Sequence, residues 1–355
     1  MKRMMCMVCV FFVGLGAGYA DVLTDVSVGT AYDTNVDGVN GGASAFVTQL
    51  SASVMRPVQL EVTDLRFYVS GDGFLFGHSG DRTFASNRLG VDYARSLASG
   101  ERDMVFAGLA LAGRANRSVY DVYDYIGLSG YVQGKWYSDE NTMKRVGYNL
   151  NWRSYQNLDV TRYVDHFFFA QVNQFLPTRT TLRADVGLGF KLRDGSEGQV
   201  VLGLQVAQSL TNNTGIRIRY QRRMNLTAAN DETARLTTLI YGDDDVLRDR
   251  YDYSGDQLTA RLTQQLPLQV RLILEGGYEK QSYKDDLALD LAGSILPSGE
   301  LREDENSFFD ASLELPLTER VATTLGYGFT RNLSNDQFYH YDKRHSLSFD
   351  LSVEF

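Results

Sequence analysis

The sequence predicts an all-β protein, a closed antiparallel transmembrane β-barrel of about sixteen strands, with fourteen as the alternative. Three observations support this prediction. The last eleven residues alternate between apolar and polar side chains, similar alternating segments recur along the chain, and the connections between them are short and long in turn. Successive side chains of a strand point to opposite faces, so alternation gives one apolar and one polar face.

The final strand carries the strongest signal. In residues 345–355, an apolar face holds Leu347, Phe349, Leu351, Val353 and Phe355, and serines and acids occupy the other. About ten residues suffice for a tilted strand to cross a hydrocarbon core. The segment resembles the closing strand of Gram-negative outer-membrane β-barrels, which the barrel assembly machinery reads at its terminal aromatic residue. The resemblance implies that Phe349, Leu351, Val353 and Phe355 form an assembly signal. It also implies that outer-membrane lipid and this machinery are partners.

The N-terminal residues predict a secretory signal peptide over 1–20, which leaves 21–355 as the barrel. Lys2 and Arg3 precede an apolar run over 4–15, and Gly18 and Ala20 are small residues suited to cleavage. The two cysteines, Cys6 and Cys9, both lie in this segment, so the mature chain would have no disulfide. Cleavage would change the formal net charge from −9 to −11, which disfavours a nucleic-acid partner.

Short turns and long loops define the strands in order. The expected short turns are 55–58, 97–101, 138–141, 176–179, 210–215, 266–269 and 315–319, which include four of the five prolines. The expected long loops are 33–42, 70–83, 116–124, 156–164, 193–198, 227–255, 284–305 and 331–344. The expected strands are 22–32, 43–55, 58–69, 84–97, 103–115, 125–137, 142–155, 165–176, 180–192, 199–210, 215–226, 256–266, 268–283, 306–315, 319–330 and 345–355. Thr63 and Asp64 are a candidate bulge in the third strand. In the eighth strand, the three consecutive phenylalanines Phe167–Phe169 leave open which side chains point inward. Short periplasmic turns and long extracellular loops are typical of outer-membrane barrels.

Composition assigns the two faces. Leu182, Val186 and Leu188 are expected to meet lipid, as are Leu202 and Leu204 on the next strand and Leu325 near the end. The expected interior charges are Arg66, Arg88, Arg114, Arg145, Arg153, Arg183, Arg217, Arg219, Arg223, Arg261 and Arg271, with Asp25, Glu61, Asp64, Asp92, Asp185, Glu275, Asp310, Glu314, Asp350 and Glu354. So many charges on one face of sixteen strands favour a water-filled lumen over a soluble sandwich.

One cluster predicts a pore wall. Arg217, Arg219 and Arg223 share a face of one strand, and Arg261 and Arg271 lie on the next two. We call these five arginines the basic wall, and we expect them to line the pore together with Glu275. The longest loop, 227–255, follows the first of these strands and contains Asp243, Asp244 and Asp245. Folded into the lumen, this acidic loop would form a constriction like that of general porins. An ordinary surface loop is the alternative.

The sequence gives little support for catalysis, a cofactor or a metal. A barrel hydrolase needs a nucleophile, a base and an orienting group within hydrogen-bond reach, and the four histidines suggest no such set. The acidic run at 243–245 lacks the twelve-residue spacing of a calcium loop. We therefore expect no catalytic residue, no cofactor and no metal site.

Residues 28–36, which include Tyr32, Asp33 and Asn35, show a further resemblance. They are similar to the opening strand of barrels attached to helical tetratricopeptide domains, in surface-lipoprotein assembly modifiers and some exopolysaccharide secretins. This chain has no helical-repeat domain, so the kinship would require a periplasmic helper from another protein. The function expected is an outer-membrane channel for small polar solutes or an exported polymer. The alternatives are a secretion or assembly barrel and a plugged structural or adhesion barrel. The sequence leaves the oligomeric state open.

The assembly signal gives a first prediction. Deleting Phe355 should lower the amount of heat-modifiable barrel in outer membranes, because the machinery would no longer meet its terminal aromatic residue. Glu354→Ala, which keeps the final phenylalanine on its own face of the strand, is the matched control. Normal levels of folded barrel without Phe355 would contradict the assignment.

Overall fold

The chain forms sixteen antiparallel strands that close into one barrel. The structure, a computed structural model, describes residues 22–77, 80–97, 102–157, 162–192, 196–227 and 251–355. The strands are β1 (Leu23–Asp33), β2 (Ala45–Leu60), β3 (Thr63–Phe76), β4 (Phe84–Ser96), β5 (Met104–Asn116), β6 (Tyr125–Asp139), β7 (Thr142–Tyr155), β8 (Tyr163–Leu176), β9 (Thr180–Leu192), β10 (Ser196–Ser209), β11 (Thr214–Asn225), β12 (Tyr253–Gln265), β13 (Arg271–Leu287), β14 (Leu301–Pro316), β15 (Val321–Ser334) and β16 (Tyr341–Glu354). The predicted fold class and the higher strand count are confirmed.

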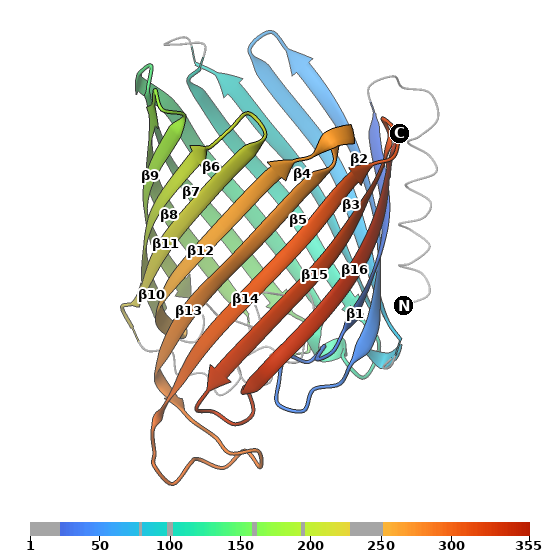
Figure 1. Ribbon diagram of the computed structural model, residues 1–355, viewed down its shortest axis with the longest axis vertical. Helices are drawn as coiled ribbons and strands as arrows, with labels where there is room; N and C mark the ends of the chain where they lie inside the picture. Colours follow the sequence, from blue (N-terminus) through green and yellow to red (C-terminus); the bar gives the residue numbers. More distant parts are fainter. Residues whose placement is uncertain (1–21, 78–79, 98–101, 158–161, 193–195, 228–250) are drawn as a thin grey trace.

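Each strand pairs with its neighbours in the chain, and the first pairs with the last. Figure 1 shows the tilted strands, with tight connections at the end where the C-terminus lies and longer connections at the other. We call these the turn end and the loop end. Among the described residues, no helix is long and apolar enough to cross a membrane.

The seam between β1 and β16 closes the barrel. Its register runs without a shift from Asp25 opposite Glu354 to Asp33 opposite Ser346. At the loop end, Arg344 donates to both carboxylate oxygens of the buried Asp33, at 2.6–3.0 Å. At the turn end, the backbone nitrogen of Phe355 donates to the carbonyl of Thr24 at 2.8 Å. The seam is therefore held at both ends as well as along its ladder.

The outer face is apolar over the whole circumference. Leu50, Leu109, Leu204 and Leu258 are each about half exposed or more, with Leu204 at 59%. Exposed apolar side chains on this scale mark contact with a partner or a membrane. The faces predicted for β9, β10 and β15 agree with the structure, since Leu182, Val186, Leu188, Leu202, Leu204 and Leu325 all point outward and are exposed.

The predicted turn at 55–58 is wrong. β2 continues to Leu60 and pairs with β3 in unbroken register, so the turn lies at Glu61 and Val62 and there is no bulge at Thr63. Glu61 consequently belongs to the turn and not to the interior. Beyond Met55, β2 no longer pairs with β1, so a proline at position 57 costs no ladder bond when its nitrogen faces the empty side.

Several loops are also shorter than predicted, including the one at 331–344, where β15 continues to Ser334 and β16 begins at Tyr341. β3 continues to Phe76, into the predicted 70–83 loop. β13 continues to Leu287 and β14 begins at Leu301, so both extend into the predicted 284–305 loop. Strand β8 has a clear phase: Phe168 points outward and is 48% exposed, and its two phenylalanine neighbours point inward. The predicted signal peptide lies outside the described residues.

The two faces can be tested by a charge placed on each. Leu204→Arg should cost about 2–4 kcal/mol of barrel stability if the site lies near mid-bilayer, because the guanidinium would face lipid. Gln205→Arg places the same group one residue away, on the inner face, and should be tolerated. Unfolding free energies in lipid vesicles measure both, and equal losses would contradict the assignment of faces.

Candidate functional site

Basic and acidic side chains occupy different sectors of the inner face. Strands β7 to β12 place seven arginines there: Arg145, Arg153, Arg183, Arg217, Arg219, Arg223 and Arg261. Strands β13 to β16 and β1 place acids there: Glu275, Glu279, Asp310, Glu314, Asp350, Glu354 and Asp25. The sorting is incomplete, because the first sector also holds Asp165, Asp185 and Glu197, and the second also holds Arg271, Arg302 and Arg344. The strands themselves thus create a transverse difference in charge across the lumen.

The structure places all five arginines of the basic wall on the inner face, but two acids neutralise its turn-end half in part. Glu275 on β13 lies 3.7 Å from Arg217 and 3.5 Å from Arg261. Arg271 donates to Glu314 on β14 at 2.6 Å. These two acids leave one positive charge in excess on Arg217, Arg261 and Arg271, and the remaining members of the basic wall are Arg219 and Arg223.

These two arginines line a cavity of about 430 Å³ on the inner face of β6 to β11, which we call the lumen pocket. Its charged lining consists of four arginines and one acid: Arg145, Arg183, Arg219, Arg223 and Asp185. Five amide side chains complete the polar lining: Gln133, Asn149, Gln171, Gln199 and Gln221. Guanidinium groups and amides together suit an anionic solute that also carries hydrogen-bonding groups.

Asp185 joins two of the arginines across an intervening strand. It accepts from Arg183 Nε at 2.8 Å and lies 3.4 Å from Arg219, which comes from β11. Gly203 on β10 lies opposite Asp185 in the register, and its missing side chain leaves room for the contact with Arg219. A Cβ at Gly203 would lie 2.3 Å from the Asp185 carboxylate, so any larger residue would displace that carboxylate.

The other two arginines lie against aromatic rings. Arg145 donates to Gln133 at 3.0 Å and lies 5.5 Å from the ring centre of Phe169. Arg223 lies 4.8 Å from the ring centre of Tyr253 and donates to its hydroxyl. Its Nε atom is buried without a hydrogen-bond partner. Neither of these arginines has a carboxylate partner among the described residues, so both retain net positive charge.

Phe167 and Phe169 lie flat on the wall because glycines face them on adjacent strands. A Cβ at Gly187 would lie 2.4 Å from the Phe167 ring, and one at Gly147 would lie 2.6 Å from the Phe169 ring. The rings therefore occupy space that side chains would otherwise take.

The predicted constriction residues Asp243, Asp244 and Asp245 lie outside the described residues. Tyr251, just before β12, is 1% exposed and donates its hydroxyl to Asp165 on β8. Its hydroxyl would lie 2.4 Å from a Cβ at Gly189 on β9. The Tyr251 side chain thus contacts β8 and β9 on the inner face at the loop end.

Sequence reasoning predicted Arg145, Arg183 and Asp185 to be interior but did not group them with the basic wall. Their grouping depends on register: Arg183 lies opposite Gln205, which lies opposite Arg219. A hydrophobic pattern shows which side chains of a strand point inward, but not which residue of the neighbouring strand lies opposite each of them. Only the structure could therefore provide this grouping.

The proposed assembly residues lie where their alternation predicts. Phe349, Leu351 and Val353 point outward on β16, and Phe355 follows the strand with 64% of its surface exposed. Their role in assembly remains a prediction. Within the described ranges, no group of three or more metal-ligating side chains is arranged to hold a metal ion.

The contact between Asp185 and Arg219 can be tested through Gly203. Gly203→Val should lower the unfolding free energy by about 1 kcal/mol, because the new side chain displaces Asp185 from its arginines. In an Asp185→Ala background the same substitution should cost less, since the space is then free. Urea unfolding in lipid vesicles measures both costs, and equal losses in the two backgrounds would show that Asp185 does not occupy this space.

Comparisons with known proteins agree on the fold. No family profile and no curated protein sequence matches the chain. Among solved structures, it is similar to a bacterial polysaccharide outer membrane secretin, with 12% identity, a TM-score of 0.53, and coverage of 95% of this chain and 99% of the other. It is also similar to the outer membrane proteins opdK and OprD from Pseudomonas aeruginosa. Identities are 12% and 9%, TM-scores 0.52 and 0.51, and coverage is 95% of this chain and 100% and 94% of the others. The chain therefore has the fold of outer-membrane β-barrels.

Proposed function

We propose that this protein is a channel in the outer membrane of a Gram-negative bacterium and that it passes small polar anions through its lumen. The observation that carries the proposal is the lumen pocket, where four arginines face the lumen beside a single acid. We further propose that the turn end faces the periplasm and the loop end faces the outside of the cell, as in other barrels with short turns at one end only.

The pocket is suited to bind an anion without trapping it. Arg145 and Arg223 lack acidic partners among the described residues, and Arg183 and Arg219 share one carboxylate. An entering carboxylate or phosphate could compete for each guanidinium through paired hydrogen bonds. Arg223 and Arg219 lie four residues apart on β11, about 13 Å, with Gln221 between them, so a solute could pass along one strand from one arginine to the other by way of the amide.

Local charge should outweigh net charge in this lumen. A solute in the pocket lies within a few ångströms of the arginines. The Debye length at physiological salt is about 8 Å, so acids on distant loops are largely screened. A protein with a net formal charge of −9 can therefore prefer anions inside its pore.

A second candidate is export of an anionic polymer with a periplasmic helper. The fold likeness to a polysaccharide secretin and the resemblance of residues 28–36 to the opening strand of such barrels favour it. This candidate predicts little conductance by the protein alone and a dependence on the helper. A plugged structural or adhesion barrel would also conduct poorly, but without any helper that opens it.

All three candidates use the barrel without catalysis. No role as an enzyme is proposed, and the proposed channel requires no cofactor. The transported solute would be distinguished from its competitors by charge and by hydrogen bonds to the five amides of the lumen pocket.

Ion selectivity tests the proposal. Replacing Arg217, Arg219 and Arg223 together with glutamate should move the reversal potential of the channel toward cation preference, because the charge nearest the permeating ions changes sign. Planar-bilayer recording under a salt gradient measures the shift, with folding checked by heat modifiability.

Arg222 provides a matched control. It lies on the same strand but points outward and pairs with Asp256. Arg219→Gln should shift selectivity, and Arg222→Gln, with an equal change in net charge, should not. If the two single substitutions shifted the reversal potential equally, or if the triple substitution did not shift it, the claim that the basic wall sets ion selectivity would be contradicted.

A further inference from the structure

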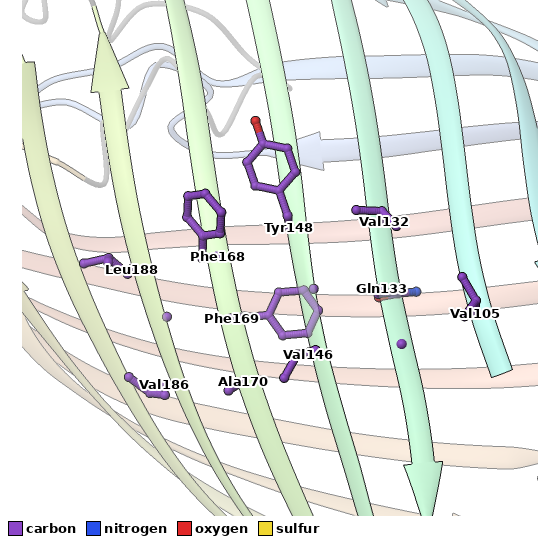
Figure 2. A pocket seen from close by; sticks show the side chains of 13 residues that line it. Val105, Val132, Gln133, Val146, Tyr148, Phe168, Phe169, Ala170, Val186 and Leu188 are labelled. Atoms are coloured by element: carbon purple, nitrogen blue, oxygen red, sulfur yellow. The ribbon is translucent and has the colours of Figure 1, made fainter. Parts of the chain in front are cut away.

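The outer face carries a hollow of about 630 Å³ that spans β5 to β9. Figure 2 shows side chains of the hollow, with Tyr148 and Phe168 toward one end and Val146, Ala170 and Val186 toward the other. Val132, Val146, Phe168 and Val186 are among the exposed apolar residues, which places the hollow on the surface that meets lipid.

Small residues in one register row form the floor of the hollow. The row crosses five strands and consists of Val105, Gly134, Val146, Ala170 and Val186. A row on the other side of β9 is built from larger side chains: Leu204, Tyr220, Leu258 and Tyr278. The surface is therefore indented where glycine and alanine interrupt the valines.

The row rises through the membrane because the strands are tilted. Val105 is the second residue of β5, at the turn end, and Val186 lies in the middle of β9. One strand beyond Val105, the row reaches Arg95, the last but one residue of β4, before it continues to Thr63 and Leu60. Arg95 is exposed, and no described residue forms an ion pair with it. A cation thus lies at the membrane boundary, at the end of an apolar hollow.

Two further residues border the hollow at the turn end. A Cβ at Gly134 would lie 3.7 Å from the Trp136 ring, so the indole leans over the small residue. Lys144 lies directly opposite Trp136 on β7. Lys144 also lies near an acid, Asp139 at the end of β6, which makes Arg95 the stronger candidate for an anionic group. Tryptophan and basic residues are typical of the interface between lipid and water.

We propose that the hollow is a binding site for a glycerophospholipid of the periplasmic leaflet. Arg95 binds the phosphate through its guanidinium, and one acyl chain lies along the row from Val105 toward Val186. An amphiphile with an anionic head and a hydrocarbon tail fits a cation at one end of an apolar hollow. The tail also restores the dispersion contacts that an unfilled hollow would lack. The site rests on the membrane orientation proposed above but not on the activity of the lumen.

Native mass spectrometry of the full-length mature barrel tests the site. The probe is phosphatidylglycerol added to the detergent-purified protein. The fraction of barrel that retains one lipid should fall about tenfold in Arg95→Gln, the scale of one lost charge-assisted hydrogen bond. Diacylglycerol with the same chains lacks the phosphate, so Arg95→Gln should not change its retention.

Filling the hollow tests the acyl-chain part of the site. Ala170→Leu should reduce the retention of both lipids, because the new side chain takes the place of the chain, and Gly134→Leu serves as the second variant. Ala260→Leu makes the same change as Ala170→Leu on the outer face of β12 and should retain lipid like the wild type. Retention unchanged in Arg95→Gln and in the leucine variants of the hollow would overturn the proposal. A dimer that Ala170→Leu dissociates, with no lipid retained, would overturn it in favour of an interface between two copies.

Discussion

Closure of the sheet between β1 and β16 is the constraint on which the rest of the structure depends. In hydrocarbon, every backbone donor and acceptor must be satisfied within the protein, and an open sheet would leave two edges unpaired. The nine-residue register of this seam, with the ion pair between Arg344 and the buried Asp33 at the loop end, removes both edges. Closure then divides every strand into an outer face that meets lipid and an inner face that meets water. All functional proposals depend on that division.

Closure with sixteen strands also makes charge on the inner face tolerable. A narrower barrel would have to fill its interior with packed side chains, whereas this one leaves cavities beside its wall. Glycines contribute to that space. Gly203 admits the carboxylate that links Arg183 to Arg219, and Gly147 and Gly187 allow two phenylalanine rings to lie flat. The same use of small residues on the outer face, at Gly134 and Ala170, produces the hollow.

Alternation along single strands was enough to predict the fold and both faces, as the outward Leu204 and the inward Arg217 illustrate. It was not enough to locate the turn after β2, where a proline lies within the strand instead of ending it. It also could not reveal the contact between Asp185 and Arg219, because that contact spans three strands and depends on their register. Periodicity is local information, and register is set by interactions between segments that are distant in sequence.

The central claim is that the inner face of β11 lines a water-filled, conducting lumen. Cysteine substitution tests it cleanly, because the two native cysteines, Cys6 and Cys9, both lie within the predicted signal peptide. Single cysteines at Arg217, Ile218, Arg219, Tyr220 and Gln221 would be treated with a negatively charged, membrane-impermeant thiol reagent during planar-bilayer recording. The account predicts a drop in current at positions 217, 219 and 221 and no change at 218 and 220. A current that does not respond at any position, or that responds at 218 and 220 instead, would contradict it.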